Sequence, residues 1–130
     1  MRISVIALFA AAAMAAAPAG AGSLDQAQKG KLIFQTHCAL CHDDSEHMLN
    51  DNGPALFGVV GRTVGSVQGY QYTAALRDAG AHGDRWTEKR LDDLLRKPTG
   101  VYGGTTMPMN FSKVGDRKAI IAYLKTLKAE

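Results

Sequence analysis

The sequence is poor in cysteine, in long apolar runs and in charge of one sign, and each shortage excludes a class of protein. Its 130 residues include only two cysteines, so a structural zinc site built from two thiol pairs is excluded. Fifteen Lys and Arg stand against twelve Asp and Glu. Because these charges are interspersed, no nucleic-acid partner is expected. Beyond residue 21 no apolar run reaches the roughly 20 residues of a membrane span.

The N-terminus has the layout of a secretory signal peptide. Arg2 precedes an apolar, alanine-rich run over residues 3–17, and Ala19-Gly20-Ala21 offers a small-residue cleavage site. The alternative is a membrane anchor, for which the run is short. We therefore expect residues 1–21 to be removed on export to the periplasm, leaving residues 22–130 as one domain. Removing Arg2 from the 15 basic residues leaves 14 against 12 acidic ones, a formal charge of +2.

Hydrophobic spacing predicts helices that are separated by long loops. Helical periodicity covers about 25–36, 73–79, 87–96 and 116–128, with Ser23 or Asp25 and Thr87 as expected N-caps. Residues 43–72 and 99–113 are rich in Gly and Pro and are expected to be irregular. No segment alternates as a half-buried strand does, so the predicted class is all-α.

Two features of these segments call for an explanation. Gly30 is costly inside a helix and is expected there to permit the close approach of another element. A structureless stretch as long as 43–72 is unusual in a compact domain. Such a loop is understandable if it wraps a prosthetic group that supplies the missing core.

The segment Cys38-Ala39-Leu40-Cys41-His42 has the C-x-x-C-H pattern of covalent haem attachment. Two thiols at this spacing can reach the two vinyl groups on one porphyrin edge, and the next residue places an imidazole beneath the ring. A thioredoxin-like pair would need a βαβ pattern, which the sequence lacks. A disulfide would close too short a loop to restrain the unfolded chain and would leave His42 unexplained. The motif favours one haem c, with its iron.

A second axial ligand has to come from a Met or His remote from the motif. Met107 and Met109 lie in the loop before the last helix, and the residues alone leave both open. A thioether ligand raises the reduction potential and favours electron transfer; a methionine can equally be core filler. His37, His47 and His82 are not expected to bind iron.

From Gly30 to about Leu127 the chain resembles the class I cytochromes c of the mitochondrial and soluble bacterial type. In chain order, the segments that carry the resemblance are Gly30-Lys31-Leu32-Ile33-Phe34, the C-x-x-C-H motif, Gly53-Pro54-Ala55-Leu56-Phe57-Gly58, Gly61-Arg62, Gly69-Tyr70-Gln71-Tyr72-Thr73, Trp86, Gly104-Thr105-Thr106-Met107 and Ala122-Tyr123-Leu124. The resemblance implies a cytochrome c fold, with about four to five helices and long loops around one haem. It also implies that the Gly and aromatic of the first helix pack against the last.

The resemblance implies a role for each residue around the iron. Cys38 and Cys41 would carry the thioether links. His42 would be the proximal ligand, and the carbonyl of Pro54 would accept a hydrogen bond from its ring. Met107 would be the distal ligand.

Other matching residues would hold the haem propionates. Arg62, Tyr72 and Trp86 resemble the groups that hydrogen-bond or neutralise a propionate in the family. Thr105 belongs to the segment that leads to Met107, and its hydroxyl is placed to bond either a propionate or neighbouring backbone. Lysines that ring the haem edge in mitochondrial relatives are mostly missing, so an intense positive patch is not expected.

Together these features predict a single-electron carrier that performs no substrate chemistry of its own. The expected partners are a periplasmic dehydrogenase, an oxidase or a membrane cytochrome complex, contacted weakly and transiently. One alternative is a haem protein that binds oxygen, nitric oxide or peroxide, which requires the distal Met to be absent or labile. Another is an electron-accepting subunit bound stably to one dehydrogenase.

Overall fold

Helices and long loops make up the part of the chain that the computed structural model describes, residues 21–129. Within these residues no strand forms, and two isolated bridges join His42 to Asn50 and Thr63 to Arg85. The predicted all-α class is confirmed. The expected signal peptide lies outside the described residues, apart from Ala21. The elements are α1 (Ala21–Ile33), a π-helical turn η1 (Phe34–Cys38), α2 (Ala74–Ala81), α3 (Glu88–Arg96), a 3-10 turn η2 (Pro98–Gly100) and α4 (Val114–Leu124).

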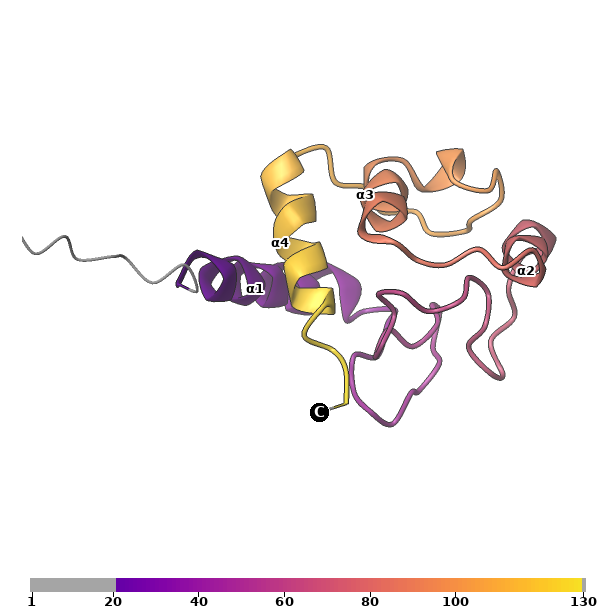
Figure 1. The fold of residues 1–130 in the computed structure, drawn as a ribbon, viewed down its shortest axis with the longest axis horizontal. Coiled ribbons are helices and arrows are strands. Elements are labelled where there is room, and N and C mark those ends of the chain that lie inside the picture. Colours follow the sequence, from indigo (N-terminus) through magenta and orange to yellow (C-terminus); the bar gives the residue numbers. More distant parts are fainter. Residues whose placement is uncertain (1–20, 130) are drawn as a thin grey trace, which may run out of the picture.

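The first and last helices cross and pack against each other (Figure 1). At the crossing, a Cβ on Gly30 would lie 1.9 Å from the carbonyl oxygen of Ala119. Only glycine therefore allows the two backbones to approach this closely. Next to this contact, the rings of Phe34 and Tyr123 lie 5.5 Å apart between centroids. The close approach predicted for Gly30, and the packing of both its helix and its aromatic on the last helix, are confirmed.

Two predicted helix boundaries are wrong by several residues. α1 begins at Ala21 and runs through Ser23 and Asp25, so neither residue caps it, and its end passes into the π-helical turn at Phe34. α4 ends at Leu124 rather than near residue 128. Just after this end, the Thr126 hydroxyl donates a hydrogen bond to the Tyr123 carbonyl at 2.7 Å. The chain then turns, and the Leu127 carbonyl accepts a hydrogen bond from Gly58 N.

The two middle helices start where a threonine caps them. The hydroxyl of Thr87 accepts a hydrogen bond from Arg90 N at 3.2 Å, which confirms the predicted start of α3. The hydroxyl of Thr73 does the same for Leu76 N at 3.4 Å. α2 continues through Gly80 to Ala81, past the predicted end near residue 79. A Cβ there would lie 2.0 Å from the Val64 carbonyl oxygen, so this glycine serves close packing.

The core joins these helices to the long loop 43–72. Val59 and Val64 of that loop are as deeply buried as Phe34 and Ile120 of the terminal helices. The loop thus contributes to the core directly, although it contains no regular element. The buried hydrophobic cluster consists of Phe34, Val59, Val64, Leu76, Ala79, Trp86, Leu91, Leu95, Ile120, Ile121, Tyr123, Leu124 and Leu127.

Candidate haem site

The C-x-x-C-H motif forms a tight turn at the end of the helical segment that begins with α1. The π-helical turn ends at Cys38, whose carbonyl oxygen accepts bonds from both Cys41 N and His42 N at 3.0 Å. A π-turn admits one extra residue per turn and is frequent at functional sites. The two sulfurs and the imidazole are therefore all presented by one short, hydrogen-bonded segment.

The two thiols of the motif are both free, and burial affects the chemistry of one of them. Cys38 and Cys41 are both described, and they form no disulfide. Burial, with a smaller contribution from Cys41, raises the pKa of Cys38 to about 11, whereas a thiol-exchange site needs a lowered pKa. No three His, Cys, Asp or Glu side chains of residues 21–129 gather as a metal site.

The imidazole of His42 is oriented by the loop that follows it. Its Nδ1 lies 2.7 Å from the carbonyl oxygen of Pro54. A carbonyl only accepts, so Nδ1 must be the donor, and Nε2 is left with a free lone pair. Burial lowers the pKa of His42 against the opposing effect of the Pro54 bond, which favours the neutral ring that binds metals. The hydrogen bond implied by the resemblance is present.

Gly53 completes the support of this ring. A Cβ at this position would lie 2.3 Å from Cε1 and 2.6 Å from Nδ1 of His42. The imidazole therefore lies directly on the backbone of the loop, in a space that any side chain would fill. The amide of Gly53 also bonds the Cys41 carbonyl at 2.8 Å.

A second set of polar side chains, not identified from the sequence, closes this loop. The carboxylate of Asp43 accepts bonds from Leu49 N at 2.9 Å and the Ser45 hydroxyl at 2.8 Å, and these bonds, the Leu49 one foremost, lower the pKa of Asp43. The amide of Asn50 accepts from Ala55 N at 3.1 Å and donates to Gln68 O at 2.8 Å. The sequence signal that could have identified Asp43 and Asn50 is their residue type, because short polar side chains in loops often bond nearby backbone.

Arg62 offers the site an unused hydrogen-bond donor. Its two terminal nitrogens donate to the carbonyls of Phe57 and Ala55, at 2.9 and 2.8 Å. Its Nε is buried and has no partner among the described residues, and burial lowers the pKa of the guanidinium. A buried donor of this kind costs free energy unless an acceptor is provided. A propionate is such an acceptor, so the residues present fit the expected group.

Two of the other predicted propionate residues lie beside Arg62. The side chain of Trp86 is buried, and its backbone N donates to the Arg62 backbone carbonyl at 2.9 Å. Burial raises the pKa of Tyr72, and the charge of Arg62 acts against that rise. The Tyr72 hydroxyl accepts a bond from Val67 N at 3.3 Å, so its proton remains available to another acceptor.

Thr105 lies in the other long loop and has a different partner. Its hydroxyl donates to the Pro98 carbonyl at 2.7 Å. A hydroxyl has one proton to give, so in this structure it is used to hold the loop to neighbouring backbone. This favours the second of the two roles considered for Thr105.

The two candidate methionines of this loop differ in their packing. Met107 and Met109 are both half-buried, but only Met107 packs against the hydrophobic core cluster. The loop returns to the core at Phe111, whose amide donates to the Leu95 carbonyl at 2.7 Å. His37 lies near this point, with its ring 6.0 Å from that of Phe111. His37, His47 and His82 are all exposed.

Comparison with known proteins places this geometry in a family. Residues 27–128 match the sequence profile of the family described as Cytochrome c. A cytochrome c of Euglena viridis is 41% identical over 103 residues, which cover 78% of this chain and 97% of that protein. Cytochrome c-550 of Ancylobacter novellus is 36% identical over 78% of this chain and 95% of the relative.

Solved structures show the same likeness in three dimensions. Cytochrome c2 from Rhodospirillum centenum superposes with a TM-score of 0.73 at 29% identity, covering 79% of this chain and 98% of that one. Ferricytochrome c2 from Rhodopseudomonas palustris gives a TM-score of 0.70 at 31% identity, with 78% and 98% covered. The likeness therefore extends over almost the whole length of both neighbours.

Proposed function

The chain belongs to the cytochrome c family, and on that premise we propose that it is a periplasmic carrier of single electrons. Members of this family carry electrons on a covalently bound haem c. We assign the thioether links to Cys38 and Cys41, the proximal ligand to His42 and the distal ligand to Met107. The observation that carries this proposal is the 2.7 Å bond from His42 Nδ1 to Pro54 O, which leaves Nε2 free beside two unpaired thiols.

The protein's part in electron transfer is to hold its ligands in one arrangement. When bound, the haem iron supplies the change between the ferric and ferrous states. Pro54 and Gly53 fix the ring plane of His42, so the ligand does not need to move between the two states. Arg62 and Tyr72 offer a cationic N–H and a hydroxyl to the propionates. No substrate chemistry is assigned to the protein itself.

The distal side of the proposal rests on packing and on loop anchoring. Met107 lies on the core cluster, between the anchors at Thr105 and Phe111. A thioether is uncharged and polarisable, and on the iron it favours electron transfer over ligand binding.

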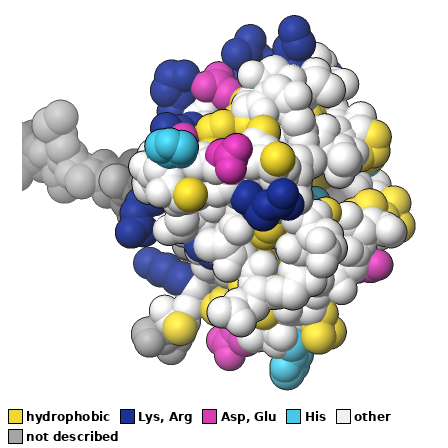
Figure 2. Space-filling model, turned by 90° about the vertical axis from the view of Figure 1, so that its right-hand side faces the viewer, with side chains coloured by type: hydrophobic (Ala, Val, Ile, Leu, Met, Phe, Trp, Pro, Cys, Tyr) yellow, Lys and Arg dark blue, Asp and Glu magenta, His cyan; other side chains and the backbone are white. Residues whose placement is uncertain are grey.

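The surface supports brief contact with several redox partners. Figure 2 shows the Lys and Arg side chains of one face mainly toward its left and upper edges, with one further group near the centre. On this face the positive charge is not gathered into one patch, and such a distribution steers encounter with partners. We propose a periplasmic dehydrogenase, an oxidase or a membrane cytochrome complex as donors and acceptors, bound transiently.

Export is the second part of the proposal. It rests on the predicted signal peptide of residues 1–21, and no described helix is long and apolar enough to cross a membrane. The native holoprotein should begin near Gly22, which mass spectrometry measures directly. Retention of Met1 on the native protein would instead favour an N-terminal anchor.

The axial ligand is tested with a matched pair of variants. In Met107→Ala the reduction potential should fall, because the thioether is lost. The weak long-wavelength band of sulfur-ligated ferric haem should disappear, and the ferrous iron should become open to carbon monoxide. Met109→Ala, two residues along the same loop, should leave all three properties unchanged.

Each other result has a distinct meaning. If the effects follow Met109 instead, the carrier function stands and the residue assignment is wrong. If the wild-type ferrous protein binds carbon monoxide readily at neutral pH, the closed six-coordinate site is wrong. The protein is then better explained as one that binds oxygen, nitric oxide or peroxide.

A further inference from the structure

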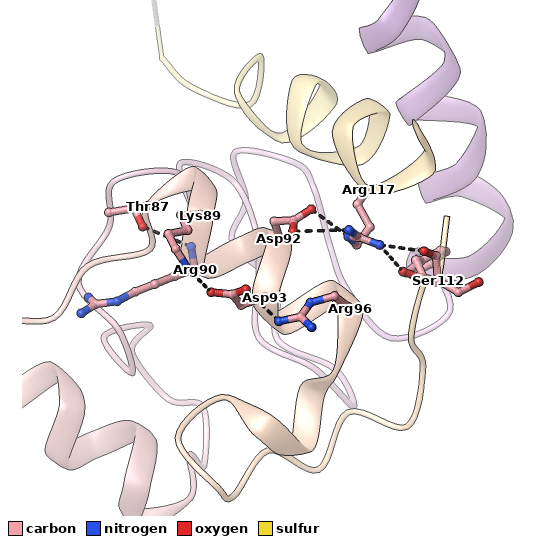
Figure 3. Close-up of polar contacts among 9 residues, drawn as sticks. Thr87, Lys89, Arg90, Asp92, Asp93, Arg96, Ser112 and Arg117 are labelled. Carbon is pink, nitrogen blue, oxygen red and sulfur yellow. Dashed lines mark hydrogen bonds and ion pairs between the residues drawn. The ribbon is translucent and has the colours of Figure 1, made fainter. Parts of the chain in front are cut away.

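Arg117 is the one charged residue that is buried among residues 21–129, with 5% of its surface exposed. It projects from the first turns of α4 toward α3 and the end of the loop over residues 99–113, here called the distal loop (Figure 3). Burying a guanidinium is costly unless its N–H groups are satisfied. An apolar side chain would fill this space at lower cost, so the position of the charge calls for a reason beyond packing.

The contacts of Arg117 tie three separate segments together. Its Nε lies 2.7 Å from Asp92 Oδ1 on α3, and its Nη2 lies 3.5 Å from the other carboxylate oxygen. Its Nη1 donates to the carbonyls of Phe111 and Ser112 at 3.0 and 2.9 Å. Four of the five N–H groups of a guanidinium are therefore directed at α3 and at the last residues of the loop.

Those last residues are the C-terminal anchor of the segment that contains Met107. Between Thr105, held to Pro98 O, and Phe111, held to Leu95 O, no residue bonds another described residue through a hydrogen bond. Arg117 adds two bonds at the Phe111 end, from a buried and charged donor. The placement of the Met107 sulfur thus depends on how firmly this end is fixed.

We propose that Arg117, oriented by Asp92, is a positioning residue that keeps the distal loop closed over the iron. This inference rests on the proposed function, because it presumes that Met107 is the distal ligand. Asp92 is less buried than its partner, with 34% of its side chain exposed. It fixes the plane of the guanidinium so that Nη1 points at the two loop carbonyls, which a fork-shaped donor can do and an ammonium cannot.

Helix α3, which carries Asp92, also offers a matched control. Arg96 of α3 pairs with Asp93 at 3.2 Å, and its side chain is 59% exposed. In Figure 3 this pair lies on α3 away from the contacts of Arg117 with the loop. Arg96→Lys therefore changes an arginine of an ion pair on α3 without touching the anchor of the loop.

The experiment measures how easily an added ligand displaces the sulfur in ferric holoprotein. Imidazole is titrated into the wild type and into Arg117→Lys, Asp92→Asn and Arg96→Lys, following the sulfur-ligated band. The apparent affinity for imidazole scales with the fraction of protein whose distal loop is open. The imidazole concentration at which half of the sulfur-ligated band is lost should therefore fall about tenfold in Arg117→Lys. It should fall less in Asp92→Asn and stay unchanged in Arg96→Lys. The midpoint of urea unfolding is recorded for each protein.

The remaining outcomes separate this inference from the proposed function. If the urea midpoints of Arg117→Lys and Asp92→Asn fall while their imidazole midpoints stay at the wild-type value, the residues are structural only and the inference is overturned. If Arg117→Lys does not fold, Asp92→Asn decides the matter alone. A wild-type ferric protein without the sulfur band overturns the Met107 assignment itself, and this inference with it.

Discussion

The two loops that face the proposed haem are built in opposite ways. The proximal loop, residues 42–62, is crossed by hydrogen bonds along its length: His42 to Pro54, Gly53 to Cys41, Leu56 N to Asp43 O and Arg62 to two carbonyls. The distal loop, residues 99–113, is bonded near its ends, and residues 106–110 make no hydrogen bond to any other described residue.

The difference lies in how the two proposed ligands are held. His42 is held by direct contacts to its ring, whereas Met107 is held only through packing and the ends of its loop. The imidazole of His42, the proposed proximal ligand, has its orientation and protonation fixed by short-range contacts. The sulfur of Met107, the proposed distal ligand, is held by packing and by the two ends of its loop, so we expect small changes there to alter how often the loop opens. Local opening is expected from the region with fewer bonds.

The largest expected effect comes from filling the space beneath the proximal ring. In Gly53→Ala, a Cβ 2.3 Å from His42 Cε1 forces the imidazole or the loop to move. We expect a loss of about 3 kcal/mol or more in the free energy of unfolding, together with a low yield of holoprotein. Urea unfolding and the ratio of haem to protein absorbance measure these two quantities.

A glycine of the distal loop provides the control. In Gly104→Ala the new Cβ would lie 3.4 Å from the Cβ of Ala75, a distance close to an ordinary contact. Stability should change by less than about 1 kcal/mol, since Gly to Ala also reduces the entropy of the unfolded chain. Equal losses in the two variants would contradict the contrast between the loops.

A smaller effect is expected where Arg62 fastens the proximal loop. Arg62→Lys retains the charge but cannot donate to Ala55 O and Phe57 O together, so about 1–3 kcal/mol should be lost. Arg85→Lys is the control, because Arg85 is exposed and donates to a single carbonyl, that of Gly61, at 2.9 Å. Denaturation of the holoproteins measures the free energy of unfolding of both variants. A loss of stability in Arg85→Lys as large as that in Arg62→Lys would contradict the prediction.

The smallest effect comes from the bond that joins α4 to the proximal loop. The hydroxyl of Tyr123 donates to Asp44 at 2.5 Å, so Tyr123→Phe should cost about 1 kcal/mol at neutral pH. Burial, and then the bond to Asp44, raises the pKa of Tyr123 above its usual value of 10.0. The unfolded chain therefore loses this proton first, and the contribution to stability declines as the pH rises above about 10.

The pH series supplies the test of that mechanism. The stability difference between the wild type and Tyr123→Phe should shrink from about pH 9 to about pH 11, because phenylalanine does not ionise. A difference that stays constant over this range would show that the hydroxyl does not titrate as its surroundings require.

Local sequence signals predicted the fold where one residue decides the outcome. Thr87 caps α3 as expected because its hydroxyl satisfies a free amide at the helix start. Gly30 indicated a close helix contact because a glycine in a helix is costly without one. The end of α4 differs from the prediction because a tertiary contact, the bond from Gly58 N to Leu127 O, fixes the chain beyond Leu124.

The residues of the candidate site likewise include some that the sequence indicated and some that it did not. The C-x-x-C-H spacing indicated the attachment turn, and Pro54 followed from the resemblance. The pair of Arg117 and Asp92 could not be found from the sequence, because the partners lie 25 positions apart and charged residues are normally exposed. Nor does any periodicity indicate that Asp44 will meet Tyr123, 79 positions away.

The contact between Gly30 and Ala119 has a consequence for how the chain folds. Each terminal helix is short, 13 residues in α1 and 11 in α4, and isolated helices of this length are marginal in water. Their meeting closes a loop of about 90 residues, for which the length-dependent entropy cost is about 4 kcal/mol. Neither helix can recover that cost before the other is in place. α1 and α4 therefore gain their structure jointly, and a deletion that removes one of them should unfold the other.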